Sequence, residues 1–340
     1  MESGQGVVDA PALPEGTFEV VEEVEGLLAG VGERAPELLA EPATEALTSG
    51  GKRLRPLLLI LSARMGEPEE DALLKASTAI EVLHTASLIH DDIVDRAESR
   101  RGSPTTFASY GREIAVATGD YLFAETFTEL AEIGDPRLIR AFSEASQGLA
   151  AGELEQYRAS GGTGGADSGA GGAADGANVE AYLDHIRMKT AGLFKAACVA
   201  GGTLGGLSLR QIDALATFGQ ALGIAFQMSD DIMDLVGKPG LMGKGIGTDL
   251  MEGTVTLPII FALREGDTGT IRRALAAPDP SPEILEAAIK AVLATDAVAK
   301  TEVWARGEIN AAFEGLGLLP GGPEREILEA VAAEVVGRSA

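Results

Sequence analysis

The feature that most restricts the fold of this chain is the spacing of its apolar residues, which recur every three or four positions over long stretches. Such spacing places apolar side chains on one face of a helix. The stretches are Leu73–Val94, Ile114–Leu130, Leu138–Tyr157, Val179–Leu204 and Ile212–Leu235. No stretch shows the apolar and polar alternation of a half-buried strand, and aromatic residues make up only 4% of the chain. The sequence therefore predicts an all-α fold of long helices.

The chain has 340 residues, of which 45% are hydrophobic, so it can bury a sizeable core. We expect a single domain, with residues 1–16 as a disordered tail and residues 258–340 as several C-terminal helices. Residues 160–177 are rich in Gly and almost without large apolar residues, so they cannot pack into a core. This segment could be an interdomain linker or a long surface loop. Because the chemical motifs lie on both sides of it, we prefer a loop within one domain.

The charge of the chain argues against several kinds of partner. Asp and Glu number 52 against 27 Lys and Arg, which gives a formal net charge of −25. So negative a protein is not expected to bind nucleic acid or an anionic membrane surface. No apolar run reaches about 18 residues, so no membrane span is expected. A single cysteine, Cys198, and an N-terminus without the features of a signal peptide indicate a cytoplasmic protein.

Two aspartate clusters carry the strongest chemical signal. Asp91–Asp95 reads Asp-Asp-Ile-Val-Asp, and Asp230–Asp234 reads Asp-Asp-Ile-Met-Asp. The first and last aspartates of each are four residues apart, so on a helix they share one face at about 5–6 Å. Two such carboxylates repel by roughly 3 kcal/mol at an effective dielectric of about 20, so in a cleft they require a cation. Carboxylate oxygens suit Mg²⁺, which also bridges to phosphate. The alternative is that an acidic chain places such pairs on solvated helix faces by chance.

Several basic residues, including half of the scarce lysines, lie before, between and after these clusters. Their segments are Gly50-Gly51-Lys52-Arg53-Leu54-Arg55-Pro56, Arg100-Arg101-Gly102, Lys189-Thr190, Lys238 and Gly243-Lys244. The chain has eight lysines, and four of them lie in these segments. Because Lys offers a point charge and Arg a planar fork to phosphate oxygens, the arrangement indicates a site for anionic ligands. An exposed turn ended by Pro56 is the alternative for the first segment.

His84 is a further candidate, because it lies seven residues before Asp91 on the same helix face and could donate a hydrogen bond to a diphosphate. The alternative is a buried histidine whose hydrogen bonds are satisfied within the protein. We find no sign of a protein nucleophile. No Gly-x-Ser-x-Gly elbow is present, and Cys198 lies in the apolar sequence Ala-Ala-Cys-Val-Ala.

Taken together, these residues resemble the trans-isoprenyl diphosphate synthase, or polyprenyl synthetase, family over about residues 50–258. The resemblance rests on the segment 50–56, on Asp91–Asp95 with Arg100-Arg101-Gly102, on Lys189-Thr190, on Gln227 before Asp230–Asp234, and on the segment 243–250. It implies a single-domain barrel of long helices around a deep central cavity, usually in a homodimer. It also implies a Mg²⁺-dependent prenyltransferase that condenses an allylic diphosphate with isopentenyl diphosphate head to tail. Pyrophosphate would be released, and an all-trans polyprenyl diphosphate of twenty carbons or more would be extended.

The resemblance implies roles for the motif residues as well. About three Mg²⁺ ions would be held by Asp91 and Asp95 from one wall and by Asp230 and Asp234 from the other. The allylic diphosphate would be bound by Arg100, Lys189, Thr190, Gln227 and Lys244, and isopentenyl diphosphate by Lys52, Arg55, His84 and Arg101. The catalytic set would be Asp91, Asp95, Asp230, Lys189 and Arg100, with Asp92 and Asp231 in supporting positions. Thr254 stands where the family often has Lys, which removes one cation from the allylic side.

Product length is a further expectation. In the family, bulk four or five positions before the first aspartate cluster forms a floor that stops chain growth. Those positions hold Ser87 and Ala86, which are small as in the longer-chain members. At about 100° per residue, Ser87 and Ile80 fall on the Asp91 side of the helix, whereas Ala86 points away. We therefore expect products longer than fifteen carbons, with Ile80 as a deeper stop. The alternative is that the small residues only allow close helix packing.

Other functions are compatible with a helical fold. A non-catalytic partner subunit of a heteromeric synthase is disfavoured because both aspartate clusters are intact. A terpene cyclase is disfavoured because such enzymes commonly lack the set Lys52, Arg55 and Arg101 for a second diphosphate. A helical scaffold whose acidic residues are merely solvated is the remaining alternative. Mg²⁺-dependent pyrophosphate release that requires both substrates would separate all of these from the synthase.

Overall fold

The computed structural model describes residues 16–100, 102–159, 178–237, 246–277 and 279–337, and its secondary structure is helical apart from one two-stranded hairpin. The helices are α1 Thr17–Glu33, α2 Glu37–Thr48, α3 Leu54–Arg64, α4 Glu70–Val94, α5 Thr106–Tyr110, α6 Arg112–Ile133, α7 Pro136–Ala159, α9 Val179–Ile186, the π-helical turn η1 Arg187–Ala191, α10 Gly192–Leu204, α11 Leu209–Val236, α12 Thr248–Met251, α13 Leu257–Glu265, α14 Thr268–Leu275, α15 Pro282–Leu293, α16 Ala297–Leu316 and α17 Pro323–Gly337. In the hairpin, β1 Ser99–Arg100 pairs antiparallel with β2 Ser103–Pro104. The predicted all-α fold is confirmed.

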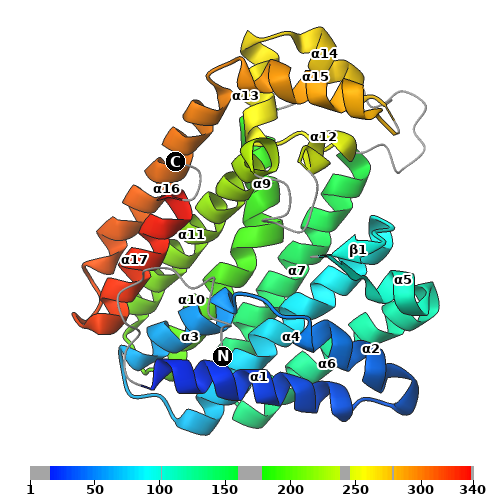
Figure 1. Ribbon diagram of the computed structural model, residues 1–340. Coiled ribbons are helices and arrows are strands. Elements are labelled where there is room, and N and C mark those ends of the chain that lie inside the picture. The colour runs from blue at the N-terminus through cyan, green and yellow to red at the C-terminus, as the bar shows by residue number, and fades with distance from the viewer. Residues whose placement is uncertain (1–15, 101, 160–177, 238–245, 278, 338–340) are drawn as a thin grey trace, which may run out of the picture.

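The predicted periodic stretches all lie in helices, and most lie in the long ones. Four of them fall within α4, α6, α7 and α11, and the fifth is divided among α9, η1 and α10. Figure 1 shows these long helices side by side, with α1 and α2 across one end of the bundle and α13, α14 and α15 at the other. Helix α10 packs against α3, α7 and α11, and α4 packs against α6 and α3. Helix α10 is therefore surrounded by the helices that carry the predicted motifs.

Apolar side chains fill the bundle in two clusters. The larger runs through α3, α4, α7, α10 and α11, and includes the fully buried Phe142, Phe194 and Phe218. The smaller lies among α1, α2, α4 and α6 and includes Leu28 and Leu47. Complete burial of each such side chain contributes roughly 1.5–3 kcal/mol. Helix α4 takes part in both clusters, so it must be apolar on two faces.

This burial on two faces explains the apolar composition of α4. In the described ranges, α4 is the one helix whose length and apolar composition would allow it to cross a membrane, although no uninterrupted apolar run marks it in the sequence. Within the protein, 72% of the relevant stretch is buried. An apolar helix of this kind is what packing between two cores requires.

Some predicted features lie outside the described residues. They are the Gly-rich segment 160–177, Arg101, Lys244 and all but the last residue of the tail 1–16. The described part of 258–340 contains α14 to α17 and most of α13.

Candidate active site

The first aspartate cluster lies at the C-terminal end of α4. Asp92 is buried, and the Nε and Nη2 atoms of Arg100 donate to its Oδ1 atom at 2.9 Å and 2.8 Å. Asp91 is half-buried and Asp95 is exposed. Arg100, which was predicted to bind the allylic diphosphate, is thus held against the cluster by Asp92. A charge-assisted pair of this kind fixes the direction of the guanidinium group.

The second aspartate cluster lies at the C-terminal end of α11 and is centred on a buried carboxylate. The hydroxyl of Tyr182 donates to Asp231 Oδ2 at 2.6 Å, and Gln227 Nε2 donates to Oδ1 at 2.9 Å. Tyr182 belongs to α9, so this network joins α9 to α11. Asp231 therefore has protein partners at both oxygens, while its neighbour Asp230 is half-buried.

Asp234, predicted as a metal ligand, has backbone partners. Its two carboxylate oxygens accept hydrogen bonds from the backbone N–H groups of Thr248 at 3.0 Å and Asp249 at 3.1 Å. These contacts tie the end of α11 to the start of α12. Asp234 thus shapes the second cluster, in addition to the ligand role predicted for it.

Lys189 lies in the π-helical turn η1 and points toward the first cluster. Its Nζ atom lies 2.5 Å from Glu153 Oε2, 2.8 Å from Gln156 Oε1 and 3.9 Å from Asp91 Oδ2. Because Glu153 and Gln156 belong to α7, Lys189 joins α7 to the end of α4. Single π-helical turns inside α-helices are frequent at functional sites.

Thr190, the next residue of η1, faces the second cluster. Its hydroxyl donates to Gln227 Oε1 at 2.7 Å, and the amide nitrogen of Gln227 donates in turn to Asp231. Of two consecutive residues of η1, Lys189 therefore contacts the first cluster, and Thr190 is linked to the second through Gln227. This turn brings the two aspartate clusters, which are far apart in the sequence, into one site.

Among the described residues of the site, acidic side chains outnumber basic ones. Burial raises the pKa of Asp91 to about 7, Lys189 opposes this rise, and Glu153 adds to it. Burial also raises the pKa of Asp231 to about 7, against the hydrogen bonds that it accepts. Burial lowers the pKa of Lys189, but Asp91 and Glu153 outweigh this and raise it overall, so the ammonium stays protonated. A divalent cation would restore the ionised form of the carboxylates.

Arg53, the second cation of the first basic segment, is structural. Its guanidinium donates to Glu25 on α1 at 2.5 Å, to Glu81 on α4 at 2.7 Å and to the carbonyl of Leu47 on α2 at 2.8 Å. Only 5% of its side chain is exposed. The alternative of an exposed turn is therefore wrong for this residue. Pro56 is buried in the first turn of α3 and does not end a turn.

The candidates for the second diphosphate lie on adjoining elements. Arg55 is half-buried at the start of α3, and its guanidinium carbon lies 4.8 Å from the ring centre of Phe194 on α10, a cation–π contact. Lys52 is exposed just before α3, and His84 is half-buried on α4. Since α3 packs against both α4 and α10, all three belong to one region of the bundle.

The chain-length candidates fall in different environments. Ser87 is buried, and its hydroxyl donates to the carbonyl of His84 at 2.7 Å. Ile80 is fully buried in the larger core cluster, whereas Ala86 belongs to the smaller cluster against α1, α2 and α6. This agrees with the geometric argument that Ala86 points away from the Asp91 face of α4.

Three residues of the site were not found from the sequence: Glu153, Gln156 and Tyr182. For the first two a signal exists, because polar residues three apart share one face near the end of an amphipathic helix. Tyr182 carries no comparable signal, since its role depends on where α9 meets α11.

The four predicted metal ligands, Asp91, Asp95, Asp230 and Asp234, come from two helices. In the part of the chain that the structure describes, no group of three or more His, Cys, Asp or Glu side chains is arranged to hold a metal ion. All four candidates are carboxylates, which are hard oxygen ligands, and the described residues of the site carry more negative than positive charge. Both properties fit Mg²⁺ held jointly by protein and phosphate oxygens.

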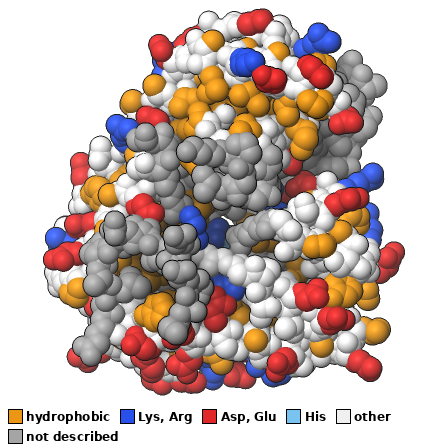
Figure 2. Space-filling view, viewed as in Figure 1, with side chains coloured by type: hydrophobic (Ala, Val, Ile, Leu, Met, Phe, Trp, Pro, Cys, Tyr) orange, Lys and Arg blue, Asp and Glu red, His pale blue; other side chains and the backbone are white. Residues whose placement is uncertain are grey.

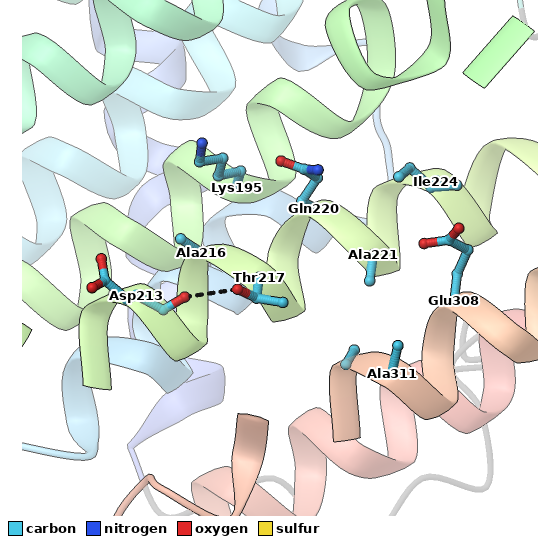
Figure 3. A pocket seen from close by; sticks show the side chains of 10 residues that line it. Lys195, Asp213, Ala216, Thr217, Gln220, Ala221, Ile224, Glu308 and Ala311 are labelled. Carbon is cyan, nitrogen blue, oxygen red and sulfur yellow. Dashed lines mark hydrogen bonds between the residues drawn. The ribbon is translucent and has the colours of Figure 1, made fainter. Parts of the chain in front are cut away.

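A pocket of about 410 Å³ lies between α10, α11 and α16 (Figure 3). Lys195, Gln220 and Glu308 contribute polar side chains to it, and the Thr217 hydroxyl donates to the carbonyl of Asp213 at 3.0 Å. None of the predicted site residues lines this pocket. The face of the molecule in Figure 2 is hollowed near its centre, where Lys and Arg side chains are visible. The deep cavity beneath the aspartates stays a prediction.

Comparison with known proteins shows similarity to one family along most of the chain. A family model described as polyprenyl synthetase matches residues 36–292. The nonaprenyl diphosphate synthase of Mycobacterium tuberculosis is 35% identical over 323 residues, which are 94% of this chain and 92% of the relative. Component 2 of the heptaprenyl diphosphate synthase of Geobacillus stearothermophilus is 34% identical over 300 residues, 86% of this chain and 88% of the relative.

Solved structures show the same similarity. A decaprenyl diphosphate synthase from Rhodobacter capsulatus has a TM-score of 0.83 at 34% identity, covering 95% of this chain and 97% of the other. A polyprenyl synthase from Caulobacter crescentus, complexed with calcium and isoprenyl diphosphate, has a TM-score of 0.86 at 30% identity, covering 95% and 96%.

Proposed function

This chain belongs to the polyprenyl synthetase family and is a prenyltransferase that extends polyprenyl diphosphates; we propose that it joins an allylic diphosphate head to tail with isopentenyl diphosphate and releases pyrophosphate. The observation that carries the proposal is the η1 turn. Lys189 contacts the first aspartate cluster from this turn, and Thr190 is linked through Gln227 to the second. Acids that suit a metal and cations that suit a phosphate thus meet in one site.

The carboxylates of the two clusters would hold Mg²⁺. Asp91 and Asp95 would contribute from α4, and Asp230, helped by Asp234, from α11. The bound ions would supply positive charge that stabilises the departing pyrophosphate. The relative from Caulobacter crescentus was crystallised with calcium and isoprenyl diphosphate, which supports a divalent cation and a diphosphate at this type of site. The number of ions per site, about three in the family, is part of the proposal.

The side chains of the protein would perform three tasks. Lys189, kept protonated by Asp91 and Glu153, would present a fixed positive charge to the allylic diphosphate, together with Arg100. Thr190 and Gln227 would orient the same group by hydrogen bonds, and Lys244 would contribute to it from outside the described residues. Arg101, also outside the described residues, would help to bind the second diphosphate.

The second diphosphate would bind on the α3 side of the bundle. Lys52, Arg55 and His84 would hold the diphosphate of isopentenyl diphosphate. The apolar core below the site would keep water from the carbocation that forms when the allylic C–O bond breaks. The alkene of the second substrate would attack this carbocation, and the new cation that results would lose a proton to the released pyrophosphate, so no protein nucleophile is required. Thr254, where many relatives have Lys, would leave the allylic side with one cation fewer.

The remaining expectations belong to the same proposal. We propose a homodimer in the cytoplasm, with a product longer than fifteen carbons and no nucleic-acid partner. The burial of α4 within the bundle supports the absence of membrane insertion.

Product analysis of the purified protein tests the proposed function. An allylic diphosphate and isopentenyl diphosphate are supplied with Mg²⁺ or with a chelator, and pyrophosphate and prenyl products are measured. We expect pyrophosphate release that requires both substrates and Mg²⁺, with products of twenty carbons or more. Release from the allylic diphosphate alone would support the cyclase alternative. No release under any condition would support the non-catalytic partner subunit or the helical scaffold.

A further inference from the structure

We propose that Gly152 of α7 and Gly223 of α11 are positioning residues, which clamp the η1 turn so that Lys189 and Thr190 reach the two aspartate clusters. The ligand that these side chains then meet, a diphosphate, rests on the proposed function. The clamp itself rests on how closely the backbones of the two helices approach the turn.

On the α7 side, the backbone of η1 lies directly against glycine. A Cβ atom at Gly152 would lie 3.2 Å from both the backbone nitrogen and the Cβ atom of Lys189. One turn earlier, a Cβ atom at Gly148 would lie 3.2 Å from the carbonyl oxygen of Met188. Both distances are shorter than ordinary van der Waals contact. A methyl group at residue 152 would therefore displace Lys189 or the turn of α7 that faces it.

On the α11 side, the approach is closer still. A Cβ atom at Gly223 would lie 2.5 Å from the Cα atom of Ala191 and 3.0 Å from its Cβ atom. At Gly219 it would lie 2.7 Å from the carbonyl oxygen of Phe194. These neighbours are mostly backbone atoms, which cannot rotate away as a side chain can. Any side chain at residue 223 would push η1 and α11 apart.

Each helix supplies its polar contact from the same face as its glycine. Gly152 is followed at once by Glu153, and Gln156 lies one turn later, so backbone contact and hydrogen bonds to Lys189 come from one patch of α7. Gly223 lies four residues before Gln227, the partner of Thr190. A shift of the turn would therefore break both kinds of contact together.

The clamp explains why a π-helical turn persists here. The turn carries one more residue than an α-helical turn, and its hydrogen bonds are less favourable, so the surrounding structure must hold it. If η1 moved, Lys189 would lose its fixed position beside Asp91. A displacement on the order of 1 Å at a reacting site lowers the reaction rate by about 100-fold. We therefore expect Gly152→Ala and Gly223→Ala to weaken binding of pyrophosphate with Mg²⁺ by roughly 10-fold or more.

Two glycines offer matched controls. A Cβ atom at Gly202 on α10 would lie 2.7 Å from the flexible end of the Leu215 side chain, away from η1. At Gly307 on α16, a Cβ atom would have no neighbour within 4 Å. Gly202→Ala thus tests a general disturbance of α10, and Gly307→Ala tests the substitution alone.

Titration calorimetry with pyrophosphate and Mg²⁺, and hydrogen exchange of the amides of residues 187–191, test the clamp. We expect the two clamp variants to bind pyrophosphate more weakly and to exchange faster at η1, with isopentenyl diphosphate binding unchanged and both controls like the wild type. Gly152→Ala carries the test if Gly223→Ala does not fold.

Wild-type binding and exchange in Gly152→Ala, or an equal loss in Gly202→Ala, would overturn the inference. If no protein binds pyrophosphate, the wild type included, while exchange at η1 still rises only in the clamp variants, the clamp stands and the proposed function fails.

Discussion

At the residue scale, the charge state of Asp91 is set by its surroundings. Burial raises its pKa to about 7, from 3.8 for an ordinary aspartate. The folded protein thus holds this proton more tightly than the unfolded chain does. Between these two pKa values unfolding releases a proton, so the free energy of unfolding contributed by Asp91 falls as the pH rises from about 4 to about 7.

Asp91→Asn should therefore stabilise the metal-free protein, and more so at pH 8 than at pH 5. Removing the buried charge removes the penalty that grows with pH, and each kcal/mol corresponds to roughly 2–4 °C in Tm for a large domain. Thermal unfolding at both pH values with a chelator measures this. Asp213→Asn, at an exposed aspartate, is the control and should change little. An equal change in Tm for Asp91→Asn at both pH values would contradict the raised pKa of Asp91.

Product length belongs to the residue scale as well, because neighbouring residues of α4 face different ways. We expect Ser87→Phe to shorten the main product, since Ser87 lies on the Asp91 side. Ala86→Phe adds the same bulk to the smaller core cluster, where overpacking should cost about 1–3 kcal/mol without shortening the product. Chromatography of products from one fixed primer compares the two variants. A shorter product from Ala86→Phe alone would show that the floor argument is wrong.

At the element scale, one buried arginine joins four helices. Arg53 stands at the start of α3 and contacts Glu25 on α1, Leu47 on α2 and Glu81 on α4. Glu81 is itself buried, with 5% of its surface exposed. The pair therefore depends on both partners, because a buried charge without a partner is strongly unfavourable.

Arg53→Ala should lower the free energy of unfolding by about 3–5 kcal/mol, because it leaves the Glu81 carboxylate buried and unpaired. Arg34→Ala is the matched control. Arg34 also pairs with two glutamates, Glu125 and Glu129, but its side chain is 53% exposed, so the loss should stay within about 1 kcal/mol. Urea denaturation measures both. Similar losses in the two variants would contradict the structural role of Arg53.

At the scale of the whole molecule, the exposure of one buried thiol measures whether the protein unfolds in a single cooperative step. Cys198 is fully buried on α10, and burial raises its pKa to about 12. We expect no reaction with a thiol reagent at pH 8 in the native protein. In denaturant, thiol exposure should follow the loss of helical circular dichroism with the same midpoint, as expected for a single domain. Labelling that precedes the loss of helix would contradict the single-domain prediction.

Much of the fold could be predicted because helix formation leaves a local pattern. The apolar stretches that became α4, α6, α7 and α11 are readable from spacing alone. The aspartate clusters can be recognised from the sequence as well, because paired carboxylates in apolar surroundings repel each other and indicate a bound cation. Among the five predicted stretches, 179–204 differs from a single helix, because η1 interrupts it.

The remaining features depend on contacts between distant segments. Arg53 and Arg55 lie two residues apart in one basic segment, yet Arg53 is buried and Arg55 is half-buried. The difference arises from the packing of α1, α2 and α4 around Arg53. Glu153 gains its role from the position of η1, which lies far away in the sequence. The π-helical turn lies close against glycines of α7 and α11, which are far from it in the sequence. Sequence spacing carries no information on such contacts.

We propose that both aspartate clusters serve one diphosphate site, and the turnover of single variants tests this. Pyrophosphate release is measured with saturating Mg²⁺ and both substrates for Asp91→Asn, Asp230→Asn and the control Asp213→Asn. We expect each cluster variant to lose roughly 100- to 1,000-fold in turnover, because charge that stabilises the leaving group is lost. The control should match the wild type. Wild-type turnover by Asp91→Asn or by Asp230→Asn would contradict the claim.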